Sequence, residues 1–163
     1  MSRKHVGRHR RDGQIMMYSQ YLSGVDASAA NGAYPWVFAL GIEEAAKVRD
    51  AYLLAGKGTY VPCFGALFLL NGQVQYWLTR LFPCASIGGE IVSMAVRVPV
   101  EYAQLSERQR EYCLLRGQLY TNKEIQVRLD VSPRSIGNLR ERVNAITGNN
   151  LREMCVALAA FWA

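Results

Sequence analysis

Short apolar runs separated by glycine-containing turns fill most of the first hundred residues, and this pattern predicts β-strands. The runs "TYVPCFGALFLL" and "QVQYWLTRLFPC" flank Asn71-Gly72, and a third run, "EIVSMAVRVPV", follows Gly88-Gly89. Asn-Gly between two apolar runs is a strong hairpin signal, and Gly-Gly is a good one. The three runs are therefore predicted to form consecutive antiparallel strands.

A helix is predicted directly before these strands. In "IEEAAKVRDAYLLAGKG" the residues Ala45, Val48 and Tyr52 recur at helical intervals, and acidic residues come first. An earlier run, "QIMMYSQYL", is strand-like. A helix combined with antiparallel strands predicts an α+β domain, which we expect to end near residues 100–104.

From Leu105 onward the apolar residues are spaced as in helices. Capping boxes are predicted for Ser106 with Gln109 and for Thr121 with Glu124, because each hydroxyl can accept an amide three residues later. Four helices are predicted, at about 106–118, 122–129, 133–146 and 151–161.

The second and third of these helices are joined by the short link 130–132. Ser132 before Pro133 is an N-cap signal, and Asn150 is a start signal for the fourth helix. A link this short requires a steep angle between the two helices, which is helix-turn-helix geometry. Residues 105–163 are therefore predicted to form an all-α four-helix domain.

The composition is that of a soluble globular protein, with half of the residues apolar and a fifth charged. No apolar run reaches the length of a membrane span, and the N-terminus lacks the apolar stretch of a secretory signal. We therefore expect a cytoplasmic protein without membrane contact. Its four cysteines form no CxxC pair, so reduced buried thiols are expected rather than a metal site.

The net charge of +6 suits an anionic partner. Both ends of the chain are basic, and residues 1–11 hold five basic residues and no acidic one. This basic N-terminal segment is interpreted either as a solvated tail or as part of a surface for an anion. The charge permits nucleic-acid binding without showing it.

Residues 105–161 resemble the C-terminal DNA-binding domain of LuxR/FixJ-type bacterial transcription regulators. The resemblance lies in "LSERQREYCLL", "TNKEIQVRLDVSPRSI" and "LREMCVAL". It implies that the third helix of the domain enters the major groove. It also implies that the fourth helix builds a dimer, with Leu151, Met154, Leu158 and Phe161 as the interface.

We expect DNA contacts from the third helix of this domain and its supporting helix. The positive end of a helix favours a phosphate, Asn can bond adenine, and Lys and Arg can neutralise phosphates. The candidate contacts, expected together on one face of the helix-turn-helix, are Lys123, Arg134, Ser135, Asn138, Arg140 and Arg142.

Several residues depart from the LuxR pattern. Leu119 stands where the family usually has Gly, and Leu139 replaces the usual His. Gly137 and Glu141 stand where Lys is common, and an acid near a phosphate repels it. These departures keep an alternative open, in which the helix-turn-helix has lost DNA reading and the chain is a protein–protein interaction module.

Residues 12–101 resemble a PAS sensor domain. "RRDGQIMMYS" resembles its early hairpin, and the connecting helix and three strands follow, with "WLTRLFP" and "GGEIV" in their usual order. The resemblance implies a PAS-like α+β fold with a sensory or dimerisation role, and an unrelated α+β domain with this strand order is the alternative. No haem or flavin motif occurs, so no cofactor is predicted, while an apolar pocket for an unknown small molecule stays open. Its larger aromatic residues are interpreted as core: Trp36, Phe64, Phe68, Tyr76 and Trp77.

No enzyme is indicated. Nucleophilic catalysis needs a histidine held in a packed cleft, and both histidines, His5 and His9, fall in the basic segment, interpreted as a tail. "AGKGT" lacks the spacing of a P-loop. The sequence therefore predicts a bacterial transcription regulator that binds double-stranded DNA as a homodimer.

Overall fold

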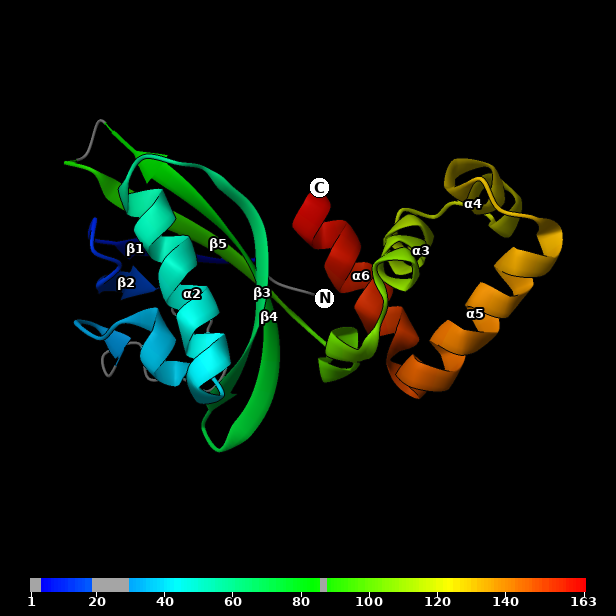
Figure 1. Cartoon of the computed structure of the whole chain (residues 1–163), viewed down its shortest axis with the longest axis horizontal. Coiled ribbons are helices and arrows are strands. Elements are labelled where there is room, and N and C mark those ends of the chain that lie inside the picture. The colour runs from blue at the N-terminus through cyan, green and yellow to red at the C-terminus, as the bar shows by residue number, and fades with distance from the viewer. Residues whose placement is uncertain (1–3, 19–29, 86–87) are drawn as a thin grey trace. The chain divides into compact units, whose positions relative to one another are not determined.

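The computed structural model describes residues 4–18, 30–85 and 88–163 of the chain (Figure 1). The chain forms two compact units, one extending to Arg97 and the other running from Val98 to Ala163. Strands and helices build the first unit, and the second is helical.

The first unit is built on a five-stranded sheet with the order β2-β1-β5-β4-β3. Strand β1 pairs antiparallel with β2 and with β5, and β3 pairs antiparallel with β4. Helix α2 lies against the sheet (Figure 1), and a short 3-10 helix, η1, precedes it. An early hairpin followed by a helix and three strands fits the predicted PAS-like fold. The bounds are β1 His5–His9, β2 Ile15–Tyr18, η1 Pro35–Phe38, α2 Gly41–Gly56, β3 Val61–Leu70, β4 Gln73–Cys84 and β5 Glu90–Val98.

The core of this unit lies between α2 and the sheet. Val48 and Tyr52, two members of the predicted apolar face of α2, are buried and cluster with Leu81 of β4 and Ile91 of β5. Ala45, the third member, is half-buried. Burying the apolar stripe of an amphipathic helix is the main source of its stability in a protein.

The predicted hairpin between β3 and β4 is confirmed. Asn71 and Gly72 have φ angles of 51° and 71°, and two consecutive positive φ angles define the tight turn that matches the twist of paired strands. Leu70 consequently faces Gln73 across the ladder.

The interpretation of the N-terminal basic segment as a tail is wrong for its central part, because residues 5–9 form strand β1. His5 and His9 are only 7% and 0% exposed. Arg8 lies on the same strand and forms a salt bridge with Glu90 of β5 at 2.7 Å. The alternation along "HVGRH" buries the two histidines and Gly7. These residue types are not apolar, so the strand lacks the alternating apolar pattern by which a buried strand face is usually predicted.

The second unit contains the four predicted helices in the predicted order. Both capping boxes are present, and the Ser132 hydroxyl accepts the Ser135 amide. The start of the fourth helix, α6, differs from the prediction. The Asn150 side chain does not cap this helix, and its amide group instead donates to a carboxylate oxygen of Glu101 at 2.9 Å. The bounds are η2 Val100–Gln104, α3 Glu107–Gly117, α4 Asn122–Leu129, α5 Pro133–Thr147, η3 Gly148–Asn150 and α6 Leu151–Trp162.

Leu119, which stands where the LuxR family usually has Gly, occupies a left-handed backbone position. It follows the end of α3 with a φ of 68°, and its side chain is 90% exposed. The next amide, of Tyr120, returns to the Leu115 carbonyl at 3.1 Å, which closes the helix end in the way that usually requires Gly. Leu119 therefore carries backbone strain at a position where its side chain gains little from burial.

We expect Leu119→Gly to stabilise the protein by about 1 kcal/mol, because a left-handed backbone costs a residue with a Cβ about 1–2 kcal/mol and Gly returns part of this as chain entropy. The measurement is urea unfolding followed by circular dichroism. Leu119→Ala is the matched control, since Ala keeps the Cβ. Equal stability of the Gly and Ala variants would contradict the explanation.

Candidate functional site

The connection between α4 and α5 fixes how the second helix leaves the first. Asp130 ends α4 with φ 50° and ψ 55°, a left-handed conformation that Asp tolerates. The Val131 amide then donates to the Gln126 carbonyl at 3.1 Å, and the Ser132 hydroxyl caps α5. Hydrogen bonds at both ends of this three-residue link hold α5 at a defined angle to α4.

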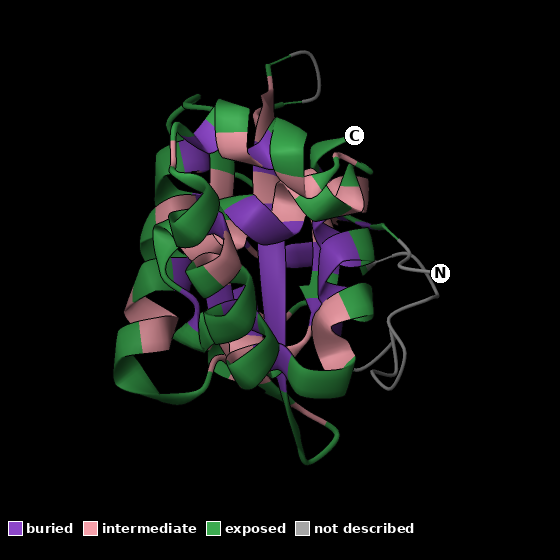
Figure 2. Cartoon of the chain, turned by 90° about the vertical axis from the view of Figure 1, so that its right-hand side faces the viewer, coloured by how far each residue is buried: buried purple, intermediate pink, exposed green. Residues whose placement is uncertain are grey.

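Helix α5 has a buried face and an outer face. Ile136, Val143 and Thr147 are buried. With 3.6 residues per turn, Arg134, Asn138 and Glu141 fall on one stripe opposite them, and all three are exposed. Exposed residues predominate on the outward-facing sides of the helices in Figure 2.

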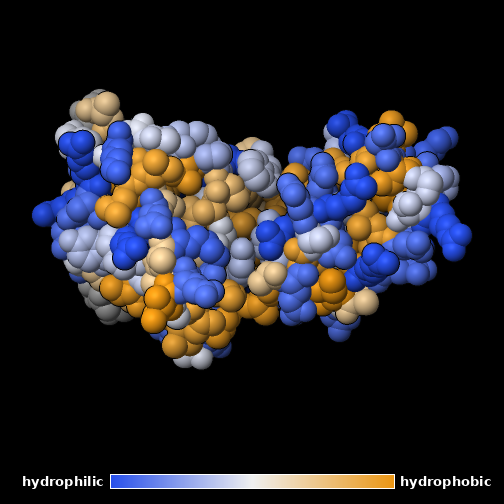
Figure 3. Space-filling view, in the orientation of Figure 1, coloured by the Kyte–Doolittle hydropathy of each residue, from blue (hydrophilic) through white to orange (hydrophobic). Residues whose placement is uncertain are grey.

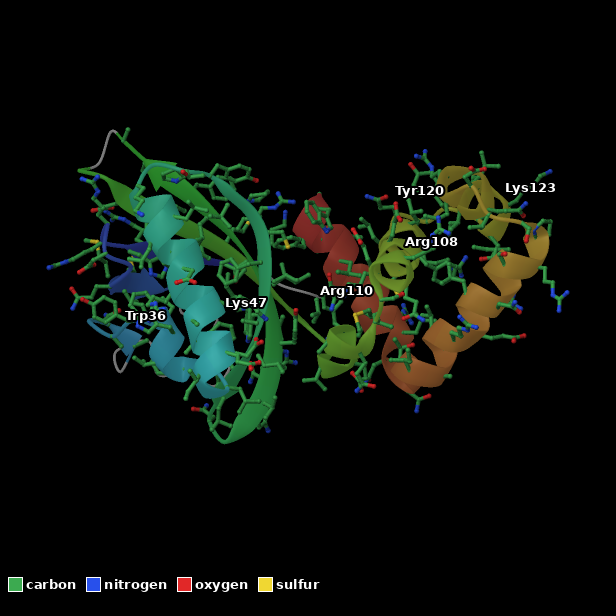
Figure 4. All side chains as sticks on the ribbon, viewed as in Figure 1. Trp36, Lys47, Arg108, Arg110, Tyr120 and Lys123 are labelled. Atoms are coloured by element: carbon green, nitrogen blue, oxygen red, sulfur yellow. The ribbon has the colours of Figure 1, made fainter. Side chains whose placement is uncertain are left out.

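All six predicted DNA contacts are exposed, but they do not share one stripe. Arg142 and Ser135 flank the outer stripe on one side. Arg140 stands two positions before Arg142, so the two side chains leave the helix in nearly opposite directions. Lys123 projects from the first turn of α4 (Figure 4).

Arg140 lies on the side of α5 that faces α3. Burial raises the pKa of Tyr112 on α3, and the nearby positive charges of Arg116 and Arg140 partly oppose that rise. Arg140 and Arg116 therefore gather around Tyr112, away from the line through Asn138.

Ser135 has a structural role in addition to its predicted one. Its amide donates to the Ser132 hydroxyl at 3.1 Å, and the two hydroxyls bond at 2.9 Å. Pro133 has no amide proton, and the Ile136 amide donates to the Ser132 carbonyl. Within this described segment the Arg134 amide is the first-turn donor left for an anion.

Arg128 is a surface cation that the sequence did not single out. Its guanidinium lies 4.0 Å from the centre of the Tyr120 ring and donates to the Tyr120 hydroxyl at 2.9 Å. Tyr120 precedes α4, so no helical spacing within α4 could have indicated the pair. Arg108 of α3 similarly ties the unit together by donating to the Leu129 carbonyl at the end of α4 (Figure 4).

Most of the side chains predicted to form a dimer interface are buried within the chain itself. Met154, Leu158 and Phe161 are at most 1% exposed, and Leu151 is half-buried. The apolar side chains that α6 exposes are Val156 and Trp162, at 44% and 43%. A dimer through α6 would therefore use this other face.

A cavity of about 70 Å³ lies in the first unit between the sheet, α2 and η1. At roughly 10–15 Å³ for one water-sized sphere, it has room for about five to seven such spheres. Its lining is mainly apolar, with His5, Thr79 and Ser93 as polar groups on the neighbouring strands β1, β4 and β5. Of the aromatic residues predicted as core, Phe64, Phe68 and Trp77 line it; Tyr76 is buried and Trp36 packs against the core.

His9 is buried in a polar cluster beside this cavity. One of its ring nitrogens, Nε2, lies 2.9 Å from the Ser93 hydroxyl and 3.3 Å from the Tyr52 hydroxyl. Burial lowers the pKa of His9 from 6.5 to about 4, with a backbone hydrogen bond to Gly13 opposing this in part. His9 is therefore neutral at pH 7.

Among the described residues no cluster of three His, Cys, Asp or Glu side chains could hold a metal ion. In the same parts of the chain no helix is long and apolar enough to cross a membrane.

Neither a family model nor a curated protein matches the sequence. Some solved structures are similar. The PAS domain of an HTR-like protein from Haloarcula marismortui is 19% identical over 58% of this chain and 81% of its own, with a TM-score of 0.47. The PAS domain of the Cronobacter turicensis quorum-sensing receptor RpfR, in complex with BDSF, is 11% identical over 59% of this chain and 94% of its own, with a TM-score of 0.49.

A third similar structure extends over both units. The Vibrio cholerae VqmA dimer, discussed with LuxR-type receptors, is 11% identical over 94% of this chain and 82% of its own, with a TM-score of 0.45. Similarity of this low degree assigns no function to this chain.

We expect the stability of the first unit to fall as the pH drops from about 6.5 to 4, because the unfolded chain binds a proton at His9 that the folded chain excludes. The stabilisation is complete above 6.5, and the loss amounts to roughly 3 kcal/mol. The measurement is unfolding at a series of pH values.

The control is the double variant His9→Phe, Ser93→Ala, which removes the titrating ring without leaving the Ser93 hydroxyl buried alone. The carboxylates titrate in both proteins, so the difference between the two pH dependences of stability isolates the contribution of His9. Identical pH dependence of the two proteins would contradict the assignment.

Proposed function

We propose that the chain is a transcription regulator whose helical unit binds double-stranded DNA by placing α5 in the major groove. The observation that carries the proposal is the capped three-residue link between α4 and α5, which leaves a polar stripe of α5 exposed. Hydrophilic residues are prominent on the surface at the α4 and α5 end of the helical unit (Figure 3). This is the arrangement in which a helix-turn-helix presents its second helix to base edges.

Each exposed group has a role that its chemistry supports. Asn138 is placed to read a base edge, because its amide can donate to and accept from adenine together. The Arg134 amide and guanidinium stand at the positive end of α5, where a phosphate is favoured. Lys123 and Arg142 neutralise phosphates beside the groove, and Arg140 and Arg116 neutralise phosphates on the side of α5 that faces α3.

Two residues limit the affinity of this face. Glu141 stands on the same stripe as Arg134 and Asn138 and repels phosphates. Gly137 contributes no side chain, although nothing lies within 4 Å of the position that a Cβ would take. The proposed regulator therefore depends on few contacts for specificity.

The first unit would supply the input of the regulator as a PAS-like sensory or dimerisation domain. Its cavity suits a small, largely apolar molecule with one hydrogen-bonding group directed toward Thr79 or His5. A homodimer would place two α5 helices on a two-fold DNA site, as is usual for this mode of binding.

A protein–protein interaction module is the second candidate, and exposed apolar residues of the first unit favour it. The Leu40 amide donates to the Leu67 carbonyl at 2.9 Å, so the start of α2 lies beside β3. Leu69 pairs with Val74 across the β3–β4 hairpin, and both side chains are nearly half exposed. Ile42, at the start of α2, is 90% exposed and is a further exposed apolar side chain of this unit.

The test is selection of bound duplexes from a random-sequence pool by the full-length protein, followed by salt titration. We expect an enriched, roughly palindromic motif, and binding that weakens steeply with salt because phosphate contacts release counterions. Asn138→Ala should cost about 1–3 kcal/mol and relax the preference at one position, whereas Arg142→Ala should reduce the salt slope by about one.

Arg49→Ala is the matched control, because Arg49 is an exposed arginine on α2, far in sequence from the proposed interface. It should leave both motif and salt slope unchanged. Absence of retention even at low salt would reject DNA binding and favour the interaction module.

A further inference from the structure

Glu141 is an acidic side chain on the stripe of α5 that is proposed to face DNA. It is exposed, and it lies nearly one turn after Asn138. Within the part of the chain that the structure describes, its carboxylate takes part in no hydrogen bond and no ion pair. An uncompensated negative charge is repelled by phosphates, so on this face the carboxylate contributes to binding only where the DNA offers it a hydrogen-bond donor.

The neighbours of Glu141 on α5 explain why its charge is not compensated. On a helix, side chains three and four positions apart are neighbours. For Glu141 these positions hold Gly137, Asn138, Asn144 and Ala145. None of the four is basic. The nearest arginines, Arg140 and Arg142, are adjacent in sequence, and adjacent residues leave a helix about 100° apart. The carboxylate is therefore available to a group outside the protein.

The glycine at position 137 leaves open space beside this carboxylate. Side chains of an α-helix lean toward its N-terminus, so the Glu141 side chain extends over the turn that contains Gly137. Nothing lies within 4 Å of the position that a Cβ would take on Gly137. Gly137 therefore places no side chain between the carboxylate and an approaching base.

The four bases differ in what they present to a carboxylate in the major groove. Cytosine presents its N4 amino group as a donor and no acceptor, whereas guanine presents two acceptors and thymine presents one. Adenine presents a donor, but its N7 acceptor stands beside that donor. A carboxylate has only acceptor oxygens. It therefore gains a hydrogen bond from cytosine and is repelled by the acceptors of the other bases.

We propose that Glu141 reads cytosine in the major groove and is a specificity-determining residue of α5. Its carboxylate accepts a hydrogen bond from the exposed N4 proton of cytosine, and the same charge disfavours duplexes with guanine or thymine at that position. Glu141 thus lowers overall affinity and raises selectivity, because selectivity is a difference of affinities that grows when the wrong partner is repelled. This inference rests on the proposed function of α5.

The spacing along α5 defines where the cytosine lies in the DNA site. Asn138 and Glu141 are three residues apart, which is about 4.5 Å along the helix axis. Successive bases of one strand are about 3.4 Å apart, so the two side chains address neighbouring base pairs. Asn138 is proposed to bond adenine. Each half-site should therefore hold an adenine and a cytosine at neighbouring base pairs.

The test compares the full-length wild-type protein with Glu141→Gln, because glutamine keeps the shape of the side chain without its charge. Both proteins select duplexes from a random-sequence pool. We expect the wild-type motif to hold a cytosine that Glu141→Gln no longer prefers, while both proteins keep the adenine attributed to Asn138. In titrations, thymine in place of that cytosine should weaken wild-type binding about tenfold or more and Glu141→Gln binding less than about threefold.

A modified base tests the hydrogen bond itself. In N4-methylcytosine paired with guanine, the methyl group replaces the amino proton that faces the major groove, while the proton that pairs with guanine stays. We expect this base to weaken wild-type binding about tenfold and to leave Glu141→Gln binding nearly unchanged. Equal binding of the wild-type protein to both forms of cytosine would overturn the proposed hydrogen bond.

The variant Gly137→Lys tests the role of the open space. A lysine at this position stands four residues before Glu141, within reach of an ion pair, and the vacant space admits its side chain. It should strengthen binding to every duplex and reduce the preference for cytosine, because the carboxylate is then neutralised. An undiminished preference would overturn the role given to Gly137.

Glu43→Gln is the matched control, because it removes one negative charge from an exposed glutamate on α2, in the other unit. It should leave the cytosine preference unchanged. An enriched motif without cytosine, or a cytosine preference that Glu141→Gln retains in full, would overturn the role of Glu141 and leave the proposed function standing. Absence of binding to any duplex would reject the proposed function and this inference with it.

Discussion

The close packing of α3 against α6 is the constraint on which the helical unit depends. Gly117 lets the two helices meet at the Cys155 carbonyl oxygen, where any larger residue would force them apart. Met154 and Leu158 are buried on α6, and Ile125 and Val143 are buried on α4 and α5. Helix α4 packs against α3 and α5, and α5 packs against α3, α4 and α6, so the two remaining helices are held by this pair and by each other.

The orientation of α5 follows from that frame and from hydrogen bonds that local sequence supplies. Arg108 holds the end of α4 to α3, Asp130 turns the chain, and Ser132 caps α5. Because these bonds use groups on the inner and terminal parts of the helices, the outer stripe with Arg134 and Asn138 stays exposed. A rigid scaffold that leaves a polar stripe in solvent is what the reading of a DNA groove requires.

Features encoded within a few residues were predictable. The capping boxes at Ser106 and Thr121, the Asn71-Gly72 turn and the helix spans in residues 105–163 follow from neighbouring residues alone. Features that depend on distant partners were not. The histidines of β1 are buried by pairing with β5, more than eighty residues away, and polar residues on a buried strand face give no hydrophobic signal.

The candidate site shows the same division. Exposure of the six predicted contacts could be inferred from helical periodicity, and so could the opposite directions of Arg140 and Arg142. The approach of Arg140 to Tyr112 depends on how α5 and α3 pack, and the stacking of Arg128 on Tyr120 depends on the turn that precedes α4. Such packing is set by side-chain shape across the whole unit, which local sequence patterns do not report.

Amide chemical shifts would show whether α5 is the element that contacts DNA. Isotopically labelled full-length protein would be titrated with a short duplex, and every amide followed by nuclear magnetic resonance. If α5 enters the groove, we expect the largest changes at Arg134, Asn138 and Arg142 on α5 and at Lys123 on α4. Changes confined to other surfaces, with the α5 amides unmoved at saturation, would contradict it.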